Sequence, residues 1–175
     1  PTIKRWISLL ETGYQIFLLY PYYQNIGKRL VKSPKIYFND TGLASFLLGL
    51  HDPESLLHSP NFGNLFETLI ITDVWKRALH SGESPALYYL RTRDGLEIDL
   101  VIESRQKLHL FEIKSAMTIW PKHASSLLRM KNSLKNSVAA GGIIRRTGAD
   151  LDRLRVVIGF EGDQPAAAAL DIVGC

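Results

Sequence analysis

The sequence is poor in features that mark several specialised classes of protein. It has one cysteine, Cys175, so it has no internal disulfide framework, which is compatible with a reducing cytoplasm. No apolar run approaches the roughly 20 residues of a membrane-spanning helix, and no basic segment followed by an apolar one indicates a secretion signal. We therefore expect a cytoplasmic protein that does not cross a membrane.

Two common catalytic signatures are also missing. A Gly-x(4)-Gly-Lys-Ser/Thr loop is absent, so this chain is not expected to hydrolyse ATP itself. No cysteine or histidine spacing indicates a zinc site. The first residue is Pro1 and not methionine, from which we expect a piece of a longer polypeptide.

Positive charge is concentrated near the start of the chain. The net charge is only +4, but residues 1–35 contain one acidic residue, Glu11, against six basic ones. Four of the basic residues form a cluster that permits contact with a nucleic-acid backbone: Lys28, Arg29, Lys32 and Lys35. A solvated face that binds nothing is the alternative, and charge alone does not decide between the two.

The least ordinary stretch is a predicted β-hairpin. Two apolar runs, Leu96–Glu103 and Leu108–Ser115, flank the polar residues Ser104–Lys107. Whether all four polar residues form the loop or only the central two turn, Glu103 pairs with Leu108. Counting back along both runs places Asp99 opposite Glu112, with Lys114 one diagonal step away.

This register predicts an electrostatic conflict. Directly opposed side chains on neighbouring strands have Cβ atoms roughly 4.5–5.5 Å apart. The carboxylates of Asp99 and Glu112 would repel at that distance, and one would become neutral unless a cation lay between them. A divalent metal with a nearby lysine resolves the conflict.

The N-terminal part predicts a helix followed by two strands. Apolar residues recur at helical spacing over 3–10, and residues 14–20 and 35–39 have the composition of strands. With a basic loop between the strands, this order resembles the last part of a winged-helix module, which binds DNA. The alternative is a packing and linker module, because Trp6 and Ile7 are expected in a core.

Two more helices are predicted on either side of a linker. Asp40 or Thr41 caps a short helix that continues to Leu50. His51–Asn61 contains proline and serine, and we place a module boundary there. A longer helix then begins near Asn61 or Leu65 and ends at Leu79.

Glu67 lies on the apolar arc of that longer helix. Its neighbours one and two turns further on are apolar, so its carboxylate is expected in a buried place. One explanation is a capping box, in which Glu67 reaches back to the helix start near Asn64. The other is a role in a site.

The remainder predicts an α/β fold. A helix is expected from Pro121 to Asn136, then strands over 138–146 and 154–160, which gives a mixed central sheet flanked by helices. Three aromatic residues are expected in the core, since such residues are more often core residues than platforms on which bases stack: Tyr88, Tyr89 and Trp120.

The spacing Asp99-x(12)-Glu112-x-Lys114 resembles the PD-(D/E)XK nuclease superfamily, although Ile98 stands where the signature usually has proline. Three further segments look like the nuclease-like domain found at the C-terminus of many prokaryotic AAA-type ATPases: Ser33–Leu43, Gly63–Glu67 and Tyr89–Asp99. This resemblance covers roughly residues 1–160. It implies a restriction-endonuclease-like core over 61–160, after a partial winged-helix module and helix over 1–50 and before a tail over 161–175.

The resemblance also implies a mechanism. Asp99, Glu112, the carbonyl of Ile113 and Glu67 would hold Mg²⁺ or Mn²⁺, and Lys114 would act on the attacking water. The expected partners are a nucleic acid, DNA before RNA, and an ATPase region of the same polypeptide. Two alternatives stay open: a catalytically silent nuclease-like module that binds DNA or protein, and a regulatory domain whose basic residues meet an acidic partner.

Overall fold

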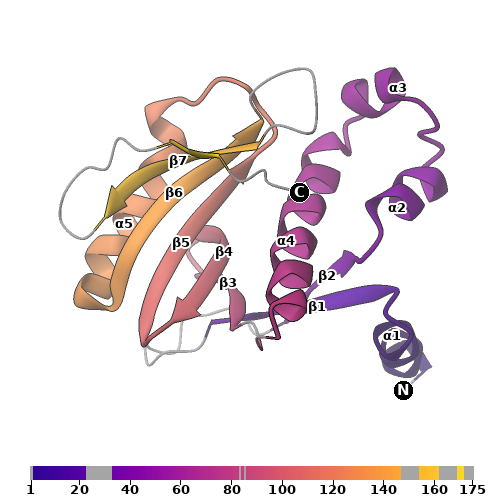
Figure 1. Cartoon of the computed structure of the whole chain (residues 1–175), viewed down its shortest axis with the longest axis horizontal. Coiled ribbons are helices and arrows are strands. Elements are labelled where there is room, and N and C mark those ends of the chain that lie inside the picture. Colours follow the sequence, from indigo (N-terminus) through magenta and orange to yellow (C-terminus); the bar gives the residue numbers. More distant parts are fainter. Residues whose placement is uncertain are drawn as a thin grey trace. The chain divides into compact units, whose positions relative to one another are not determined.

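The computed structural model describes residues 2–22, 33–82, 84, 86–146, 154–161 and 169–171, the last two ranges and Pro121 as backbone only. The elements form two compact units, which meet in the sequence near Pro85 (Figure 1). None of the helices that the structure describes has both the length and the hydropathy that crossing a bilayer requires.

The first unit is mostly helical. Its elements are α1 (Thr2–Thr12), β1 (Ile16–Pro21), β2 (Lys35–Phe38), α2 (Thr41–Leu47), α3 (Pro53–His58) and α4 (Phe62–His80). β1 pairs antiparallel with β2, so that Ile16 lies opposite Phe38. The predicted helix, strand pair and long helix are therefore present in their expected places.

Aspartate caps explain where the short helices begin. The carboxylate of Asp40 accepts a hydrogen bond from the backbone N–H of Leu43 at 3.0 Å, so Asp40 and not Thr41 is the cap of α2. Asp52 caps α3 in the same way through Ser55 at 2.8 Å, with Pro53 at the first helical position. The linker expected over His51–Asn61 contains the helix α3, which was not predicted because this aspartate–proline start signal was overlooked.

The prediction of a buried face on α1 was also wrong. No residue of this helix is buried, and the indole of Trp6 is 66% exposed. The core of the first unit comes instead from α4, where Phe66, Ile70 and Ile71 are almost fully buried. The ring of Trp75 on α4 stacks on Phe17 of β1, with centroids 4.9 Å apart.

The second unit is a mixed sheet, as expected. Its strands are β3 (Leu87–Arg91), β4 (Glu97–Ser104), β5 (Lys107–Lys114), β6 (Val138–Arg146), β7 (Leu154–Glu161) and β8 (Ala169–Asp171). They are neighbours in chain order. β5 and β6 run parallel and the other neighbours antiparallel. The parallel pair is connected by the short helix η2 (Pro121–Ala124), then α5 (Ser125–Leu134) and η3 (Lys135–Ser137).

The hairpin has the predicted register. Glu103 pairs with Leu108 and Ser104 with Lys107, so only Arg105 and Gln106 form the turn. Both turn residues have positive φ, 50° and 62°. This is the backbone that a two-residue turn needs to match the twist of its strands.

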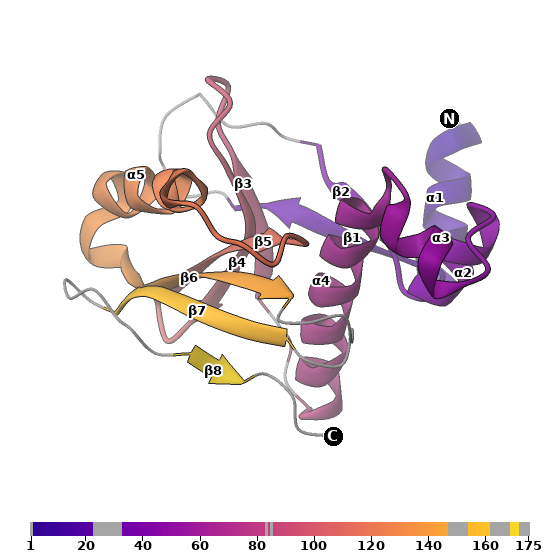
Figure 2. The same ribbon diagram turned by 90° about the horizontal axis from the view of Figure 1, so that it is seen from above.

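Helix α5 covers one face of this sheet (Figure 2). Its buried residues Leu127, Met130 and Leu134 belong to one apolar cluster with Val101 of β4 and Leu110 of β5. The spacing of three and four residues along α5 is that of a helix with one buried stripe. On β4 and β5, the side chains at every second position from Val101 and Leu110 therefore lie on the same face of the sheet as α5. The side chains between those positions point to the opposite face.

Candidate functional site

Strand alternation places Asp99 and Glu112 on the α5 side of the sheet. Val101 pairs with Leu110, and both belong to the cluster beneath α5. Two positions along each strand in the direction away from the turn come Asp99 and Glu112, on that same face. Both residues are buried, with exposed fractions of 8% and 9%.

The hairpin opens at this point. The backbone pairing of β4 with β5 ends at Leu100 and Phe111. Beyond this pair, the backbone N–H of Ile113 donates a hydrogen bond to Asp99 Oδ2 at 2.8 Å. A side-chain carboxylate thus takes the place of a backbone acceptor, which fixes its direction at the end of the hairpin.

Lys114 connects the two carboxylates. Its Nζ lies 2.6 Å from Glu112 Oε1 and 3.7 Å from Asp99 Oδ2. The lysine side chain is 31% exposed and the two carboxylates much less, so the ion pairs lie at the edge of the buried region. The structure therefore brings together Asp99, Glu112 and Lys114 from the sequence-based site.

The site is electrostatically frustrated at Glu112. Burial, and then the nearby charge of Asp99, raise the pKa of the Glu112 carboxyl from 4.5 to about 7, although Lys114 opposes the shift. Its second oxygen, Oε2, is buried and has no hydrogen-bond partner among the residues that the structure describes. A buried carboxylate oxygen in this state favours either a proton or an added cation.

A magnesium ion fits this donor set. Across the described ranges, no group of three or more His, Cys, Asp or Glu side chains is gathered to hold a metal. Mg²⁺, however, is commonly bound through one or two carboxylates and keeps several of its waters. Asp99, Glu112 and the carbonyl of Ile113 match that requirement, since all three offer hard oxygen ligands.

Glu67 has partners within the first unit. Its Oε1 accepts hydrogen bonds from the Tyr37 hydroxyl at 2.5 Å and from Lys35 Nζ at 3.1 Å. The capping-box explanation was wrong, because α4 begins at Phe62 and this carboxylate bonds two side chains of β2 instead. Its role as a metal ligand stays a prediction.

The predicted basic cluster is seen only in part. Lys28, Arg29 and Lys32 lie outside the described residues. Lys35 forms the ion pair with Glu67, and its side chain is 24% exposed. A part-buried lysine with a carboxylate partner has less charge to offer to a phosphate.

Sequence reasoning missed one residue near the carboxylates and misjudged the exposure of an aromatic residue. Arg145 of β6 lies beside Lys114 in the parallel pairing, on the same face, and its Nη1 donates to the carbonyl of Met117 at 2.6 Å. Trp120 is 58% exposed, so the expectation of a core position was wrong for this residue. The expectation was right for Tyr89, which is buried, and for Tyr88, which packs against the core cluster.

Fold and site together define a class: a mixed α/β domain with a carboxylate–carboxylate–lysine cluster where a hairpin opens. Residues 62–160 match the family described as Domain of unknown function (DUF4143), and the chain belongs to this family. Residues 1–54 are similar to a second family, Domain of unknown function (DUF8612).

Longer bacterial proteins are similar in sequence to part of this chain. An uncharacterized protein of Mycobacterium tuberculosis and one of Mycobacterium bovis are each 37% identical to the chain over 117 residues. The match covers 67% of this chain but 26% of each relative, so the chain spans about a quarter of the length of these proteins. No solved structure matches the chain.

Proposed function

We propose that the chain is a metal-dependent nuclease module with the PD-(D/E)XK arrangement of residues. The observation that carries this proposal is the pair of buried carboxylates, Asp99 and Glu112, on adjacent strands with Lys114 in an ion pair with each. Burying two acids side by side costs free energy unless a cation is bound between them. In a site that binds a metal, the bound cation offsets this cost.

Each residue has a separate task in phosphodiester hydrolysis. Asp99, Glu112 and the Ile113 carbonyl would hold Mg²⁺ or Mn²⁺, which when bound supplies Lewis acidity and a more acidic water. Asp99 Oδ2 accepts the hydrogen bond from the Ile113 N–H, which fixes the direction of this carboxylate at the end of the hairpin. Lys114, with its ammonium beside both carboxylates, orients the attacking water and stabilises the charge that develops on the phosphate.

The same proposal covers the wider architecture. The second unit would be a restriction-endonuclease-like core, and α1 with β1 and β2 the end of a winged-helix module. The relatives are several times longer than the matched region, which supports a longer polypeptide. From the resemblance of the sequence, the chain would be the C-terminal module of a cytoplasmic AAA-type ATPase. DNA is the substrate that we propose first.

Three variants assayed for metal binding and for cleavage test the activity. We expect wild-type protein to bind Mn²⁺ in calorimetry and to nick DNA or RNA. Lys114→Ala should cut about 100- to 1,000-fold more slowly with metal affinity nearly unchanged, since a protonated lysine is no metal ligand. Asp99→Ala should lose both properties. Arg105→Ala, which removes an exposed cation at the turn of the same hairpin, is the control and should behave as wild type.

A catalytically silent module is the second candidate. It is favoured by one observation: Lys114 already neutralises both carboxylates, so the site is satisfied in part without a metal. Wild-type protein that binds no Mn²⁺, and whose Asp99→Ala variant retains nucleic acid equally well, would overturn the nuclease proposal. Metal binding without cleavage, even by the full-length protein, would favour the silent module.

A further inference from the structure

Charge is segregated in the second half of the chain. From Lys114 to Arg146 the sequence contains no Asp or Glu, in a chain that has 17 acidic residues. Seven basic residues fall in the same stretch: Lys114, Lys122, Arg129, Lys131, Lys135, Arg145 and Arg146. A stretch of one sign creates a positive potential that attracts polyanions.

The fold turns much of this charge outward. Helix α5 buries Leu127, Met130 and Leu134, so its opposite side faces solvent. Lys122, Arg129 and Lys135 are exposed, and Lys131 is partly exposed. Lys122 belongs to η2, Arg129 and Lys131 to α5 and Lys135 to η3. Exposed cations on consecutive elements suit contact with successive phosphates.

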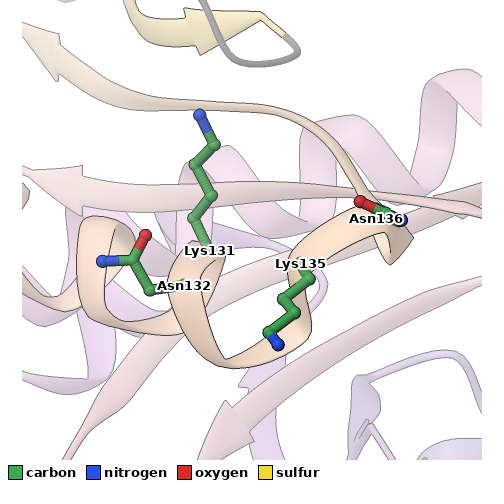
Figure 3. A pocket seen from close by; sticks show the side chains of 4 residues that line it. All are labelled: Lys131, Asn132, Lys135 and Asn136. Atoms are coloured by element: carbon green, nitrogen blue, oxygen red, sulfur yellow. The ribbon is translucent and has the colours of Figure 1, made fainter.

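A polar cavity lies at the C-terminal end of this helix. It has a volume of about 350 Å³ and is lined by Lys131, Asn132, Lys135 and Asn136. Lys131 and Lys135 extend from the helix in different directions (Figure 3). They therefore do not surround one small anion, and their spread fits a chain of phosphates better. The Asn136 carbonyl accepts a hydrogen bond from Lys107 Nζ at 2.6 Å, which ties this end to β5.

An exposed aromatic ring lies at the other end. Trp120 is 58% exposed although its chain neighbours are fixed: Ile119 packs against the core cluster, and the Trp120 backbone N–H donates to His123 Nδ1 at 3.2 Å. The bond from Arg145 to the Met117 carbonyl holds the preceding residues. A large ring held in solvent by a fixed backbone is arranged to stack on a planar ligand.

We propose that α5 and the segment leading into it form the single-stranded nucleic-acid surface of this protein. Trp120 stacks on a base, and Arg129 and Lys135 contact phosphates. The proposal rests on the proposed function for the kind of ligand and names the surface that binds it, in place of the basic cluster over residues 28–35. Stacking on an indole requires an unpaired base, which is why the ligand is a single strand.

Binding of a fluorescein-labelled oligothymidylate, followed by anisotropy with a chelator present so that nothing is cut, tests the stacking. We expect Trp120→Ala to weaken binding by between about 5-fold and 150-fold, whereas Trp120→Phe retains most of the affinity. Phe46→Ala is the control, because Phe46 is an aromatic residue of α2 with a similarly exposed side chain. Equal affinity of wild type and Trp120→Ala, or loss in Trp120→Phe as severe as in Trp120→Ala, would overturn the stacking role.

The salt dependence of the same binding tests the charges. Arg129→Gln and Lys135→Gln should each reduce the slope of log affinity against log salt by about 0.7, the value for one phosphate contact on a single strand. Arg93→Gln, an exposed arginine of the loop between β3 and β4, should leave the slope unchanged. Unchanged slopes in both Arg129→Gln and Lys135→Gln would show that the phosphate contacts are made elsewhere on the protein.

The inference and the nuclease proposal fail in different ways. If the protein cuts DNA but its affinity for single strands is unchanged by the Trp120, Arg129 and Lys135 variants, the nuclease proposal stands and the proposed surface is wrong. A protein that binds single strands through Trp120 and never cuts keeps the surface and loses the nuclease. If duplex DNA of the same length binds more tightly than the single strand, the surface recognises a duplex and the proposal is wrong.

Discussion

Lys114 reaches its position through the same alternation that places Glu112, because residues two apart on a strand share a face. The 2.6 Å contact between them is therefore a local consequence of the Glu-Ile-Lys order, whereas the contact with Asp99 depends on the hairpin register. Of Asp99, Glu112 and Lys114, Glu112 has the least favourable surroundings for its charge, since one of its oxygens lacks a hydrogen-bond partner among the described residues.

The raised pKa of Glu112, about 7, predicts that the metal-free protein loses stability as pH rises from about 4.5 to 7. In that window the folded state keeps a proton that the unfolded state has released, so the free energy of unfolding falls with increasing pH and then levels off. The loss amounts to at most about 3 kcal/mol. Urea unfolding at a series of pH values measures it.

Glu112→Gln should remove this pH dependence, since a glutamine does not titrate. Glu103→Gln changes another carboxylate of the same hairpin and is the control, expected to keep the wild-type slope. A wild-type stability that is flat or rises over the window would show that Glu112 is ionised at its ordinary pKa.

Glu67→Gln should lower the free energy of unfolding by about 1 to 2 kcal/mol, because Lys35 loses its counter-ion in a part-buried place. Thermal unfolding checks this value, with Glu54→Gln on the exposed surface of α3 as the control. Calorimetry with Mn²⁺ on the same protein tests the predicted ligand role. If Glu67 is a ligand the affinity falls, and if it serves only Lys35 and Tyr37 the affinity stays the same.

Among the elements, the hairpin turn contains avoidable strain. Arg105 and Gln106 both have positive φ, which costs a residue with a side chain roughly 1 kcal/mol and glycine almost nothing. Gln106→Gly should therefore raise the free energy of unfolding by about 0.5 to 1 kcal/mol, as measured in urea. Gln106→Ala retains the Cβ and should give no gain. A loss of stability in the glycine variant would mean that the Gln106 side chain contributes more than its backbone strain costs.

Local patterns explain which elements could be predicted. The hairpin follows from alternation and a short polar turn, so its register and the meeting of Asp99 with Glu112 were accessible from the sequence. Arg145 was not, because its place beside Lys114 depends on a parallel pairing across the whole of α5. The prediction for Trp120 was wrong because an indole is usually buried. Its exposure follows from the contacts that fix the neighbouring residues, and these contacts are not visible in the sequence.

For the whole molecule, the metal site should show as ligand-linked stability. A ligand that binds only the folded state raises the free energy of unfolding by about 2.7 kcal/mol at 100 times its dissociation constant. For a domain of this size that raises the midpoint of thermal unfolding by about 5 to 10 °C. We expect saturating Mn²⁺ to produce this shift in wild type, and excess chelator to reverse it. If the two compact units unfold in separate transitions, the one that contains Asp99 should move. Asp99→Ala should show no shift, and Arg105→Ala should match wild type. A shift of equal size in Asp99→Ala would place the metal elsewhere on the chain.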